Sequence, residues 1–341
     1  MNKILRLYNK QFVIELFTKE VLPLYPDFES VKNVKITAHK NHVWETTYHV
    51  VIEFTTIFLD KDGKTRRLPI FCSAHSDEPR KNVYRSLKYL WENGFGQGYL
   101  TIPHALFYSD YFQGTFYRGV EGDNLYQFIR RKDLKTVEEL LPKAARWFAK
   151  LHSIPAEKAE NFNPINSLIE TVYPGVPHTL MRIKKQYPKY SQCYKELYDH
   201  FVKEENKFLG STKNRWLVHG DAHPENVIKM GRKKTAVIDF TDLCIADFAR
   251  DLGAFLQQLE FMAMRKIGDP AYAEKLKQLF LDSYFAASRA SLSSETKKRI
   301  EMYYYWTTIR TATFFLIKYE PEPERGYPLI EKVCANLKIN I

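Results

Sequence analysis

His219-Gly-Asp-Ala-His-Pro-Glu-Asn226 and Val237-Ile-Asp-Phe240 are the most informative stretches of this chain of 341 residues. Asn226 follows Asp221 by five residues, and Asp239 follows it by eighteen. Apolar runs precede the first stretch (Trp216-Leu-Val218) and Asp239 (Ala236-Val-Ile238), which predicts a short strand at each. Phosphoryl transfer from a nucleotide needs one carboxylate to orient the attacking hydroxyl, and an amide and a second carboxylate to hold divalent metal. A loop with two polar turns would explain any one of these residues, but not all three in this order.

Three further stretches extend the pattern. They are Arg118-Gly-Val-Glu-Gly-Asp-Asn-Leu125, Trp147-Phe-Ala-Lys-Leu-His-Ser-Ile-Pro155 and Ala246-Asp-Phe-Ala-Arg-Asp-Leu-Gly253. With them, the chain resembles the aminoglycoside phosphotransferase and choline kinase group, small-molecule kinases built on the protein-kinase fold. The resemblance runs from about residue 115 to 255.

The resemblance implies ATP as the phosphoryl donor, Mg²⁺ as the metal and a role for each residue of the opening stretches. Asp221 matches the family's catalytic base, which orients the acceptor hydroxyl and takes its proton. Asn226 and Asp239 match the metal ligands, and Mg²⁺ prefers such oxygen donors. We therefore treat Asp221, Asn226 and Asp239 as the candidate catalytic residues. The alternative for Asp221 is a turn aspartate that caps a loop.

Neighbouring polar residues are expected to support this loop. We expect His219 to buttress it from beneath. His223 either touches the acceptor or the phosphate, or is a surface residue. Asp247 and Asp251 match positions that brace the loop and begin the next helix, and an N-cap is the natural use of Asp247.

The part that should hold the nucleotide departs from the family pattern. Arg118 and Val120 match the linker whose backbone pairs with adenine, so both are candidate nucleotide-binding residues. The family's lysine on the third strand is missing, because that strand ends in Cys72-Ser73. We expect the first hairpin at residues 37–43, where no glycine lets the backbone approach phosphate, so Lys40 is the candidate there. The basic residues that could replace the missing lysine are Lys64, Arg66, Arg67, Arg80 and Lys81.

The element pattern predicts an α+β, protein-kinase-like fold with two lobes. Residues 1–30 read as a helical extension with one amphipathic helix at 11–21. Residues 31–118 read as an antiparallel sheet with one helix, which forms the nucleotide-binding lobe. Residues 119–341 read as a mostly helical lobe that carries the catalytic loop and, from about residue 271, three late helices for the acceptor.

The late helices give no motif that names the acceptor. Met302-Tyr-Tyr-Tyr-Trp306 is apolar all round, so core packing is the first interpretation, and rings that stack on a sugar or cage an ammonium group are the second. Glu301, Arg310, Lys318 and Glu320 are possible polar contacts, among which the sequence does not choose.

Bulk composition narrows the partners. The formal charge of +11 comes from dispersed basic residues without a nucleic-acid motif, so we expect a solvated basic surface and no nucleic acid. The same charge makes a polycationic acceptor a poor candidate. No apolar run of about 18 residues suggests membrane insertion, and no signal peptide is apparent. The four scattered cysteines suit reduced thiols, so we expect a cytoplasmic protein of unassigned oligomeric state.

Two functions follow from these observations. The first is an ATP- and Mg²⁺-dependent phosphotransferase acting on a hydroxyl of a small molecule, such as a sugar, an amino alcohol or an envelope saccharide. The second is a pseudokinase, a binding or scaffolding module, which the missing lysine and glycines favour.

Overall fold

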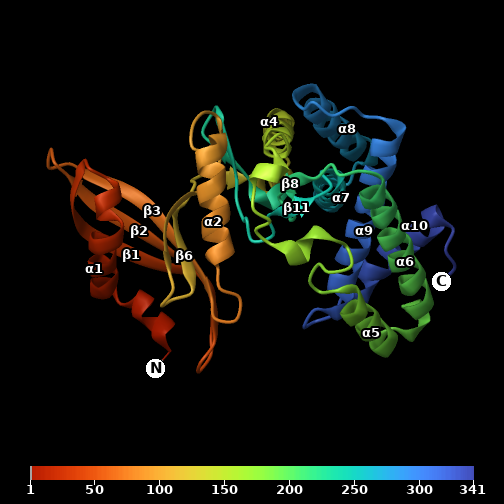
Figure 1. Ribbon diagram of the computed structural model, residues 1–341, viewed down its shortest axis with the longest axis horizontal. Coiled ribbons are helices and arrows are strands. Elements are labelled where there is room, and N and C mark those ends of the chain that lie inside the picture. The colour runs from red at the N-terminus through yellow and green to blue at the C-terminus, as the bar shows by residue number, and fades with distance from the viewer. Residues whose placement is uncertain (1) are drawn as a thin grey trace. The chain divides into compact units, whose positions relative to one another are not determined.

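The computed structural model describes residues 2–341, which form two compact units (Figure 1). The first unit runs to Gly122 and also includes Ile228–Thr241. The second unit comprises Asp123–Val227 and Asp242–Ile341. The chain therefore enters the second unit, returns to the first for the segment that carries Asp239, and then ends in the second. We describe each unit by itself.

The first unit is built on a five-stranded antiparallel sheet with the strand order β1-β2-β3-β6-β5. Its strands are β1 (Phe28–Val43), β2 (Tyr48–Asp60), β3 (Thr65–His75), β6 (Gly114–Arg118) and β5 (His104–Ser109). A tight turn after Asp60 joins β2 to β3: Gly63 has a φ of 74°, and the Asp60 carboxylate accepts hydrogen bonds from the Asp62 and Lys64 amides. A carboxylate that accepts from its own turn fixes the register of β2 and β3.

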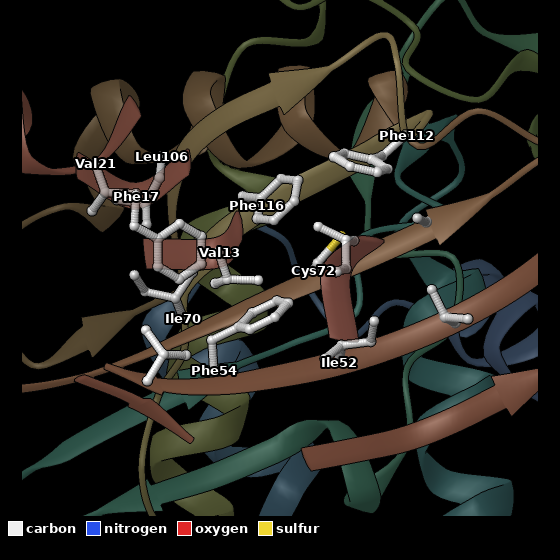
Figure 2. Close-up of a cluster of buried hydrophobic side chains, with 14 of the residues drawn as sticks. Val13, Phe17, Val21, Ile52, Phe54, Ile70, Cys72, Leu106, Phe112 and Phe116 are labelled. Carbon is white, nitrogen blue, oxygen red and sulfur yellow. The ribbon is translucent and has the colours of Figure 1, made fainter. Parts of the chain in front are cut away.

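One face of this sheet is covered by the N-terminal helices. The short 3-10 helix η1 (Lys3–Tyr8) leads into α1 (Lys10–Glu20), and a second 3-10 turn, η2 (Leu22–Leu24), precedes β1 (Figure 1). Figure 2 shows Phe17 of α1 among apolar side chains of the strands, and its ring meets that of Phe54 edge-on at 5.3 Å. Alternate residues of β2 and β3 point into this core, including Ile52 and Cys72, which are fully buried.

The first hairpin differs from the prediction. Residues 37–43, which we expected to form its turn, belong to β1, and β2 begins only at Tyr48. The turn lies at Trp44–Thr47, where the Trp44 amide donates to the Thr47 carbonyl at 2.9 Å. Neither stretch contains glycine, so no turn signal distinguished them. Lys40 is thus a strand residue and not a loop residue.

The remaining elements of the first unit lie beside the main sheet. They are α2 (Lys81–Leu90), a π-helical turn (Trp91–Phe95), and a small sheet in which β4 (Leu100–Thr101), β10 (Lys234–Val237) and β9 (Val227–Met230) are neighbours. Asn82 of α2 donates from Nδ2 to the Thr241 carbonyl at 3.1 Å. This bond ties α2 to the segment that carries Asp239.

The second unit is mostly helical. Its helices are α3 (Leu125–Arg131), α4 (Leu134–His152), α5 (Val176–Gln186), α6 (Ser191–Ser211), α7 (Ala249–Lys266), α8 (Pro270–Ala287), α9 (Ser294–Ile317) and α10 (Pro323–Leu337). Short 3-10 turns occur at Ala156–Lys158, Pro164–Ser167, Pro188–Tyr190 and Pro224–Asn226, and β7 (Asp123–Asn124) opens the unit. The hairpin-like pair β8 (Trp216–Val218) and β11 (Cys244–Ala246) is antiparallel.

The core of the second unit is made by α4, α7, α8 and α9. α4 packs against α8, and α7 packs against both α8 and α9. The large aromatic side chains Trp147 of α4, Phe255 of α7 and Trp306 of α9 are buried among them. Gly253 permits the close approach of α7 to α9, because a Cβ there would lie 2.6 Å from the Ile300 carbonyl oxygen. No helix within residues 2–341 has the length and apolarity needed to cross a membrane.

Candidate active site

The loop that carries Asp221 follows β8 in the second unit. Gly220 precedes Asp221 with a φ of 82°, and a Cβ at this position would lie 2.3 Å from the Asp242 carbonyl oxygen. Only glycine adopts this backbone without strain and also leaves room for that carbonyl. The glycine of the His-Gly-Asp motif is therefore explained by the turn that brings Asp221 out of β8.

Asp251 of α7 braces the same loop from within the core. Its carboxylate accepts from the backbone amides of His219 at 2.7 Å and Gly220 at 3.0 Å, and its Oδ2 lies 3.0 Å from His152 Nε2. His152 Nδ1 in turn lies 2.8 Å from the Tyr284 hydroxyl. Burial acts to raise the pKa of Asp251, but these hydrogen bonds and the nearby histidines outweigh it, so the pKa falls below its ordinary value. Asp251 therefore holds the loop as a carboxylate.

Asp247 acts at the start of α7. Its Oδ1 accepts from the Ala249 amide at 3.1 Å and from the Arg299 guanidinium. Burial raises the pKa of Asp247, and Arg299 opposes this effect. These contacts are those of a residue that begins a helix and joins α7 to α9.

Asp221 is held by two side chains of its own loop. His223 Nε2 lies 3.3 Å from Asp221 Oδ2, and Asn226 donates from Nδ2 to the Asp221 carbonyl at 2.9 Å. The Asp221 side chain is 48% exposed, so it is open to a ligand. Burial acts to raise the pKa of Asp221, but the hydrogen bond from His223, followed by the influences of His219 and Arg310, lowers it well below its ordinary range. Asp221 is therefore ionised at neutral pH.

The hydrogen bonds of His223 determine which of its ring nitrogens carries the proton. Its Nδ1 accepts from the Glu225 amide at 3.2 Å, so the neutral ring carries its proton on Nε2 and donates it to Asp221. The sequence left His223 undecided between a contact with the acceptor and a surface position. The structure makes it a neighbour of Asp221 instead.

The two candidate metal ligands each keep an oxygen available. Asn226 is buried and uses its amide nitrogen for Asp221, which leaves Oδ1 as an acceptor. Asp239, in the first unit, is exposed with a φ of 65°, and its Oδ1 accepts from the Thr241 hydroxyl at 2.8 Å. Amide and carboxylate oxygens are both donors that Mg²⁺ accepts. No cluster of three or more His, Cys, Asp or Glu residues within 2–341 could hold a metal by itself.

A cavity of about 590 Å³ opens beside Asp221 in the second unit. Its wall consists of the loop at Gly220–Glu225 and side chains of α3, α7, α9 and α10. Trp306, Phe314 and Phe315 supply aromatic surface, and Gln258, Thr307 and Thr311 supply polar groups. This volume is typical of a site for a small molecule, and Asp221 lies in its wall.

The structure chooses among the four polar residues that the sequence left open. Arg310 and Lys318 line the cavity beside Asp221. Glu301 lines a different cavity together with Tyr304 and Tyr305, and Glu320 lines neither. Of the aromatic run in α9, Tyr303 and Trp306 are buried, as the core interpretation predicted, and Trp306 also faces the Asp221 cavity.

The candidate nucleotide-binding residues lie in the first unit. Arg118 ends β6 and is exposed, and the half-buried Val120 follows it. Lys40 lies on β1 with its Nζ 3.4 Å from His49 Nε2. Phe116 is in the core, whereas Tyr117 faces the opposite side of the sheet and stacks on Phe71 at 5.8 Å. Burial and the charge of Asp239 raise the pKa of Tyr117.

The family's strand lysine has no direct replacement among the residues that the sequence offered. Cys72 is fully buried on the core side of β3. The five basic candidates all have acidic partners: Lys64 pairs with Asp62, Arg66 with Asp60, Arg67 with Glu121, Arg80 with Glu78 and Lys81 with Asp110. On α2, the Asn82 side chain donates to the Thr241 carbonyl.

Some residues of the site had no signal in the sequence. Arg265, at the end of α7, and Arg325, at the start of α10, also line the Asp221 cavity. They lie far from the motif along the chain, and a single charged residue in a helix has the pattern of an ordinary solvated face. Only the packing of α7, α9 and α10 brings them to Asp221.

Comparisons with known proteins agree with this architecture. Residues 49–291 match the phosphotransferase enzyme family, APH. An ethanolamine kinase from Plasmodium vivax aligns with a TM-score of 0.58 at 14% identity, over 96% of this chain and 88% of that chain. The ADP-bound aminoglycoside phosphotransferase APH(2'')-Ib aligns with a TM-score of 0.54 at 14% identity, over 94% of this chain and 97% of that chain. A glucosamine kinase aligns with a TM-score of 0.53 at 12% identity, over 95% of this chain and 98% of that chain.

These structural similarities confirm the predicted α+β, kinase-like fold. No curated protein matches the sequence. The family match covers well over half of the chain, including β2, the Asp221 loop and α8. The chain therefore belongs to the phosphotransferase enzyme family.

Proposed function

We propose that the protein transfers the γ-phosphoryl group of ATP to a hydroxyl of a small molecule bound in the cavity beside Asp221. The carrying observation is that Asp221 is ionised, half-exposed in the wall of that cavity, and held by His223 and Asn226. A carboxylate that is fixed in direction but open to a ligand suits the orientation of a hydroxyl for attack.

In this reaction the acceptor hydroxyl oxygen forms a bond to the γ-phosphorus, and the bond from that phosphorus to the β–γ bridging oxygen breaks. ADP leaves, and Asp221 takes the hydroxyl proton and passes it to water. Because the pKa of Asp221 is low, its main contribution is to orient the hydroxyl, and it accepts the proton late in the transfer.

Asn226 and Asp239 are the proposed holders of Mg²⁺ on the phosphates. Each has an oxygen that its intramolecular hydrogen bonds leave available. When bound, the metal neutralises charge that develops on the phosphates. The backbone at Arg118–Val120 is the proposed contact for adenine, and Lys40 is the proposed side-chain contact for the phosphates.

The departures on the nucleotide side favour a second candidate, a module that binds a partner without turnover. β3 has Cys72 and Ser73 where the family has its lysine, and the five basic alternatives are engaged in ion pairs. Titration of the protein with ATP, with and without Mg²⁺, distinguishes the two candidates. A ligand that binds only the folded protein raises its melting temperature, so a binding module that has lost the nucleotide site would show no Mg²⁺-dependent rise.

An acceptor screen tests the proposed activity. Purified protein is incubated with Mg²⁺, ATP or GTP, and a panel of sugars, amino alcohols and hydroxy acids, and phosphorylated products are detected by mass spectrometry. We expect at least one product whose formation needs both nucleoside triphosphate and Mg²⁺ and is lost in Asp239→Asn. Product formation that is unchanged in Asp239→Asn would contradict the metal assignment, and no product from any class would favour the binding module.

A further inference from the structure

The wall of the Asp221 cavity carries an excess of positive charge. Four basic side chains line it: Arg265 of α7, Arg310 of α9, Lys318 at the end of α9, and Arg325 of α10. Among its acidic lining residues are Asp221 and Glu225, which both belong to the catalytic loop. Basic side chains thus lie on the helices, while the carboxylates stay at the point where the hydroxyl would be oriented.

The positive charges of two of these side chains are partly neutralised by a carboxylate. Lys318 and Arg325 both form ion pairs with Glu322, so they share one carboxylate. Arg325 also packs over the Phe315 ring, 3.9 Å from its centre. Because two cations share one carboxylate, the α9–α10 end of the cavity keeps a net positive charge. The ion pairs and the ring contact hold these two side chains in place.

Arg310 is different, because it has no carboxylate partner within residues 2–341. Its NH2 donates to the Tyr173 carbonyl at 3.3 Å, and its guanidinium lies 4.9 Å from the centre of the Trp306 ring. Burial and the neighbouring Arg250 lower the pKa of Arg310, while Asp221 acts in the opposite direction. Burying a guanidinium without a carboxylate partner costs free energy unless an anionic ligand supplies the missing charge and hydrogen bonds.

Arg265 is also available. It is exposed in the last turn of α7, and it forms no ion pair or hydrogen bond with the rest of residues 2–341. Its position also complements the negative end of the helix, a contribution that an anionic ligand would not remove. Arg265 and Arg310 therefore supply two guanidinium groups whose forked geometry matches a carboxylate or a phosphate.

The position of these residues in the chain supports a role in specificity. The match to the phosphotransferase family ends at residue 291, so Arg310, Lys318 and Arg325 lie beyond it. The loop that positions the hydroxyl lies within the matched part, whereas most of the positive wall comes from the part that the family match does not include. A wall of this charge also repels a polycationic acceptor.

We propose that the acceptor is a hydroxyl compound that carries a carboxylate or phosphate group, with Arg310 and Arg265 binding the anion while the hydroxyl faces Asp221. This inference rests on the proposed function, because it assigns the cavity beside Asp221 to the acceptor. A carboxylate or a phosphate uses the same contacts, and a neutral or cationic analogue would leave both guanidinium groups without a partner.

Binding in the absence of nucleotide tests this inference separately from catalysis. The probes are glucose, glucuronate and glucose 6-phosphate, which share a sugar ring and differ in charge. Calorimetry and thermal denaturation would be measured for the full chain, for Arg310→Met and Arg265→Met, and for the control Arg289→Met. Arg289 is an exposed arginine of the same unit that lines a separate cavity, so its variant removes the same charge elsewhere.

We expect at least one of the two anions to bind the wild-type protein more tightly than glucose. Arg310→Met should lower the affinity for that anion by roughly ten- to a hundred-fold, the range for a charge-assisted hydrogen bond. The affinity of this variant for glucose, and the affinity of Arg289→Met for the anion, should stay almost unchanged. A preference for glucuronate assigns the anion as a carboxylate, and a preference for glucose 6-phosphate assigns it as a phosphate.

Failure of both anions to bind better than glucose would overturn the inference, as would anion binding that survives in Arg310→Met and Arg265→Met. Equal weakening of glucose and the anions would show that Arg310 only shapes the cavity. Since no nucleotide is present, each of these results leaves the transfer activity to be judged by the acceptor screen.

Discussion

At the scale of single residues, Asp221 is defined by its neighbours as much as by the motif. His223, which the sequence did not assign, is the first of the side chains that keep the Asp221 carboxylate ionised. Asn226 holds the backbone of Asp221 with one side of its amide and keeps the other side available. These contacts turn a sequence pattern into a carboxylate of fixed direction and charge.

The His223–Asp221 pair gives a prediction about pH. In His223→Ala, burial would be opposed only by the weaker influences of His219 and Arg310, so the pKa of Asp221 should rise. A base with a raised pKa is protonated at higher pH, so the acid-side loss of kcat/KM should begin at higher pH than in the wild type. We expect a several-fold loss at pH 5 and a smaller one at pH 8.

The matched variant is His223→Gln, whose amide can still donate to Asp221. Partial return of the wild-type pH profile in this variant would support the hydrogen bond. Superimposable profiles for wild type and His223→Ala would show that His223 does not control the ionisation of Asp221.

Asp251 gives a prediction about stability. Its lowered pKa means that it stabilises the fold above its ordinary pKa of about 4, and that this contribution is lost as the pH falls through the folded-state value. Asp251→Asn should cost roughly 2 to 4 kcal/mol at pH 7, because it leaves the amides of His219 and Gly220 and the His152 ring with a poorer partner.

The variant should also lose less stability than the wild type on acidification, since the carboxylate that titrates has gone. Urea unfolding at pH 7 measures the first effect, and unfolding at a series of pH values from 5 downward, through the folded-state pKa, measures the second. Hydrogen exchange of residues 216–226 reports on the loop itself. Asp199→Asn, on the exposed face of α6, is the control. Equal stabilities of the two variants at pH 7 would remove Asp251 from the account of the loop.

At the scale of elements, a close approach between two backbones accounts for the glycine of the motif. Gly220 and Gly268 have nearly the same φ, 82° and 80°, but a Cβ at Gly220 would lie 2.3 Å from a carbonyl oxygen, while the nearest atom at Gly268 is 4.0 Å away. Alanine at Gly268 should cost about 1 kcal/mol from backbone strain alone. Alanine at Gly220 should cost at least about 2 kcal/mol more, or displace the loop and abolish activity.

This pair of variants separates conformational strain from steric exclusion. Both glycines lie in the second unit, so unfolding of that unit measures both. Similar destabilisation by the two alanines, with activity retained, would mean that the Asp242 backbone can move away at little cost and that the turn tolerates a side chain.

Most elements were predictable because their signals are local. The turn after Asp60 carries Asp and Gly, and the late helices carry apolar faces at helical spacing. Elements whose signal was weak were missed, such as α5 (Val176–Gln186), or shifted, such as the first hairpin. Residues 37–47 contain neither glycine nor proline, so the pairing of β1 with β2 decides where the chain reverses.

The candidate site shows the same limit. Asp221, Asn226 and Asp239 lie within one motif, so the sequence could place them together as a hypothesis. Arg265, Arg310 and Arg325 come from three helices, and only tertiary packing brings them to one cavity. A residue that contributes charge through packing has no spacing rule that the sequence could reveal.

At the scale of the whole molecule, the charge of +11 has a local counterpart. The dispersed basic residues that the sequence could not assign include four that line the cavity beside Asp221. The family match includes the loop that carries Asp221, and it ends before α9 and α10, which supply three of these four basic side chains.

The rate of Asp221→Asn tests whether Asp221 orients the acceptor for phosphoryl transfer. With an acceptor from the screen, saturating Mg²⁺ and ATP, the variant should lose roughly 10²- to 10⁴-fold in kcat. Its melting temperature and its affinity for ATP should stay close to those of the wild type and of Asp199→Asn. A wild-type kcat in a folded, nucleotide-binding Asp221→Asn protein would contradict this role of Asp221.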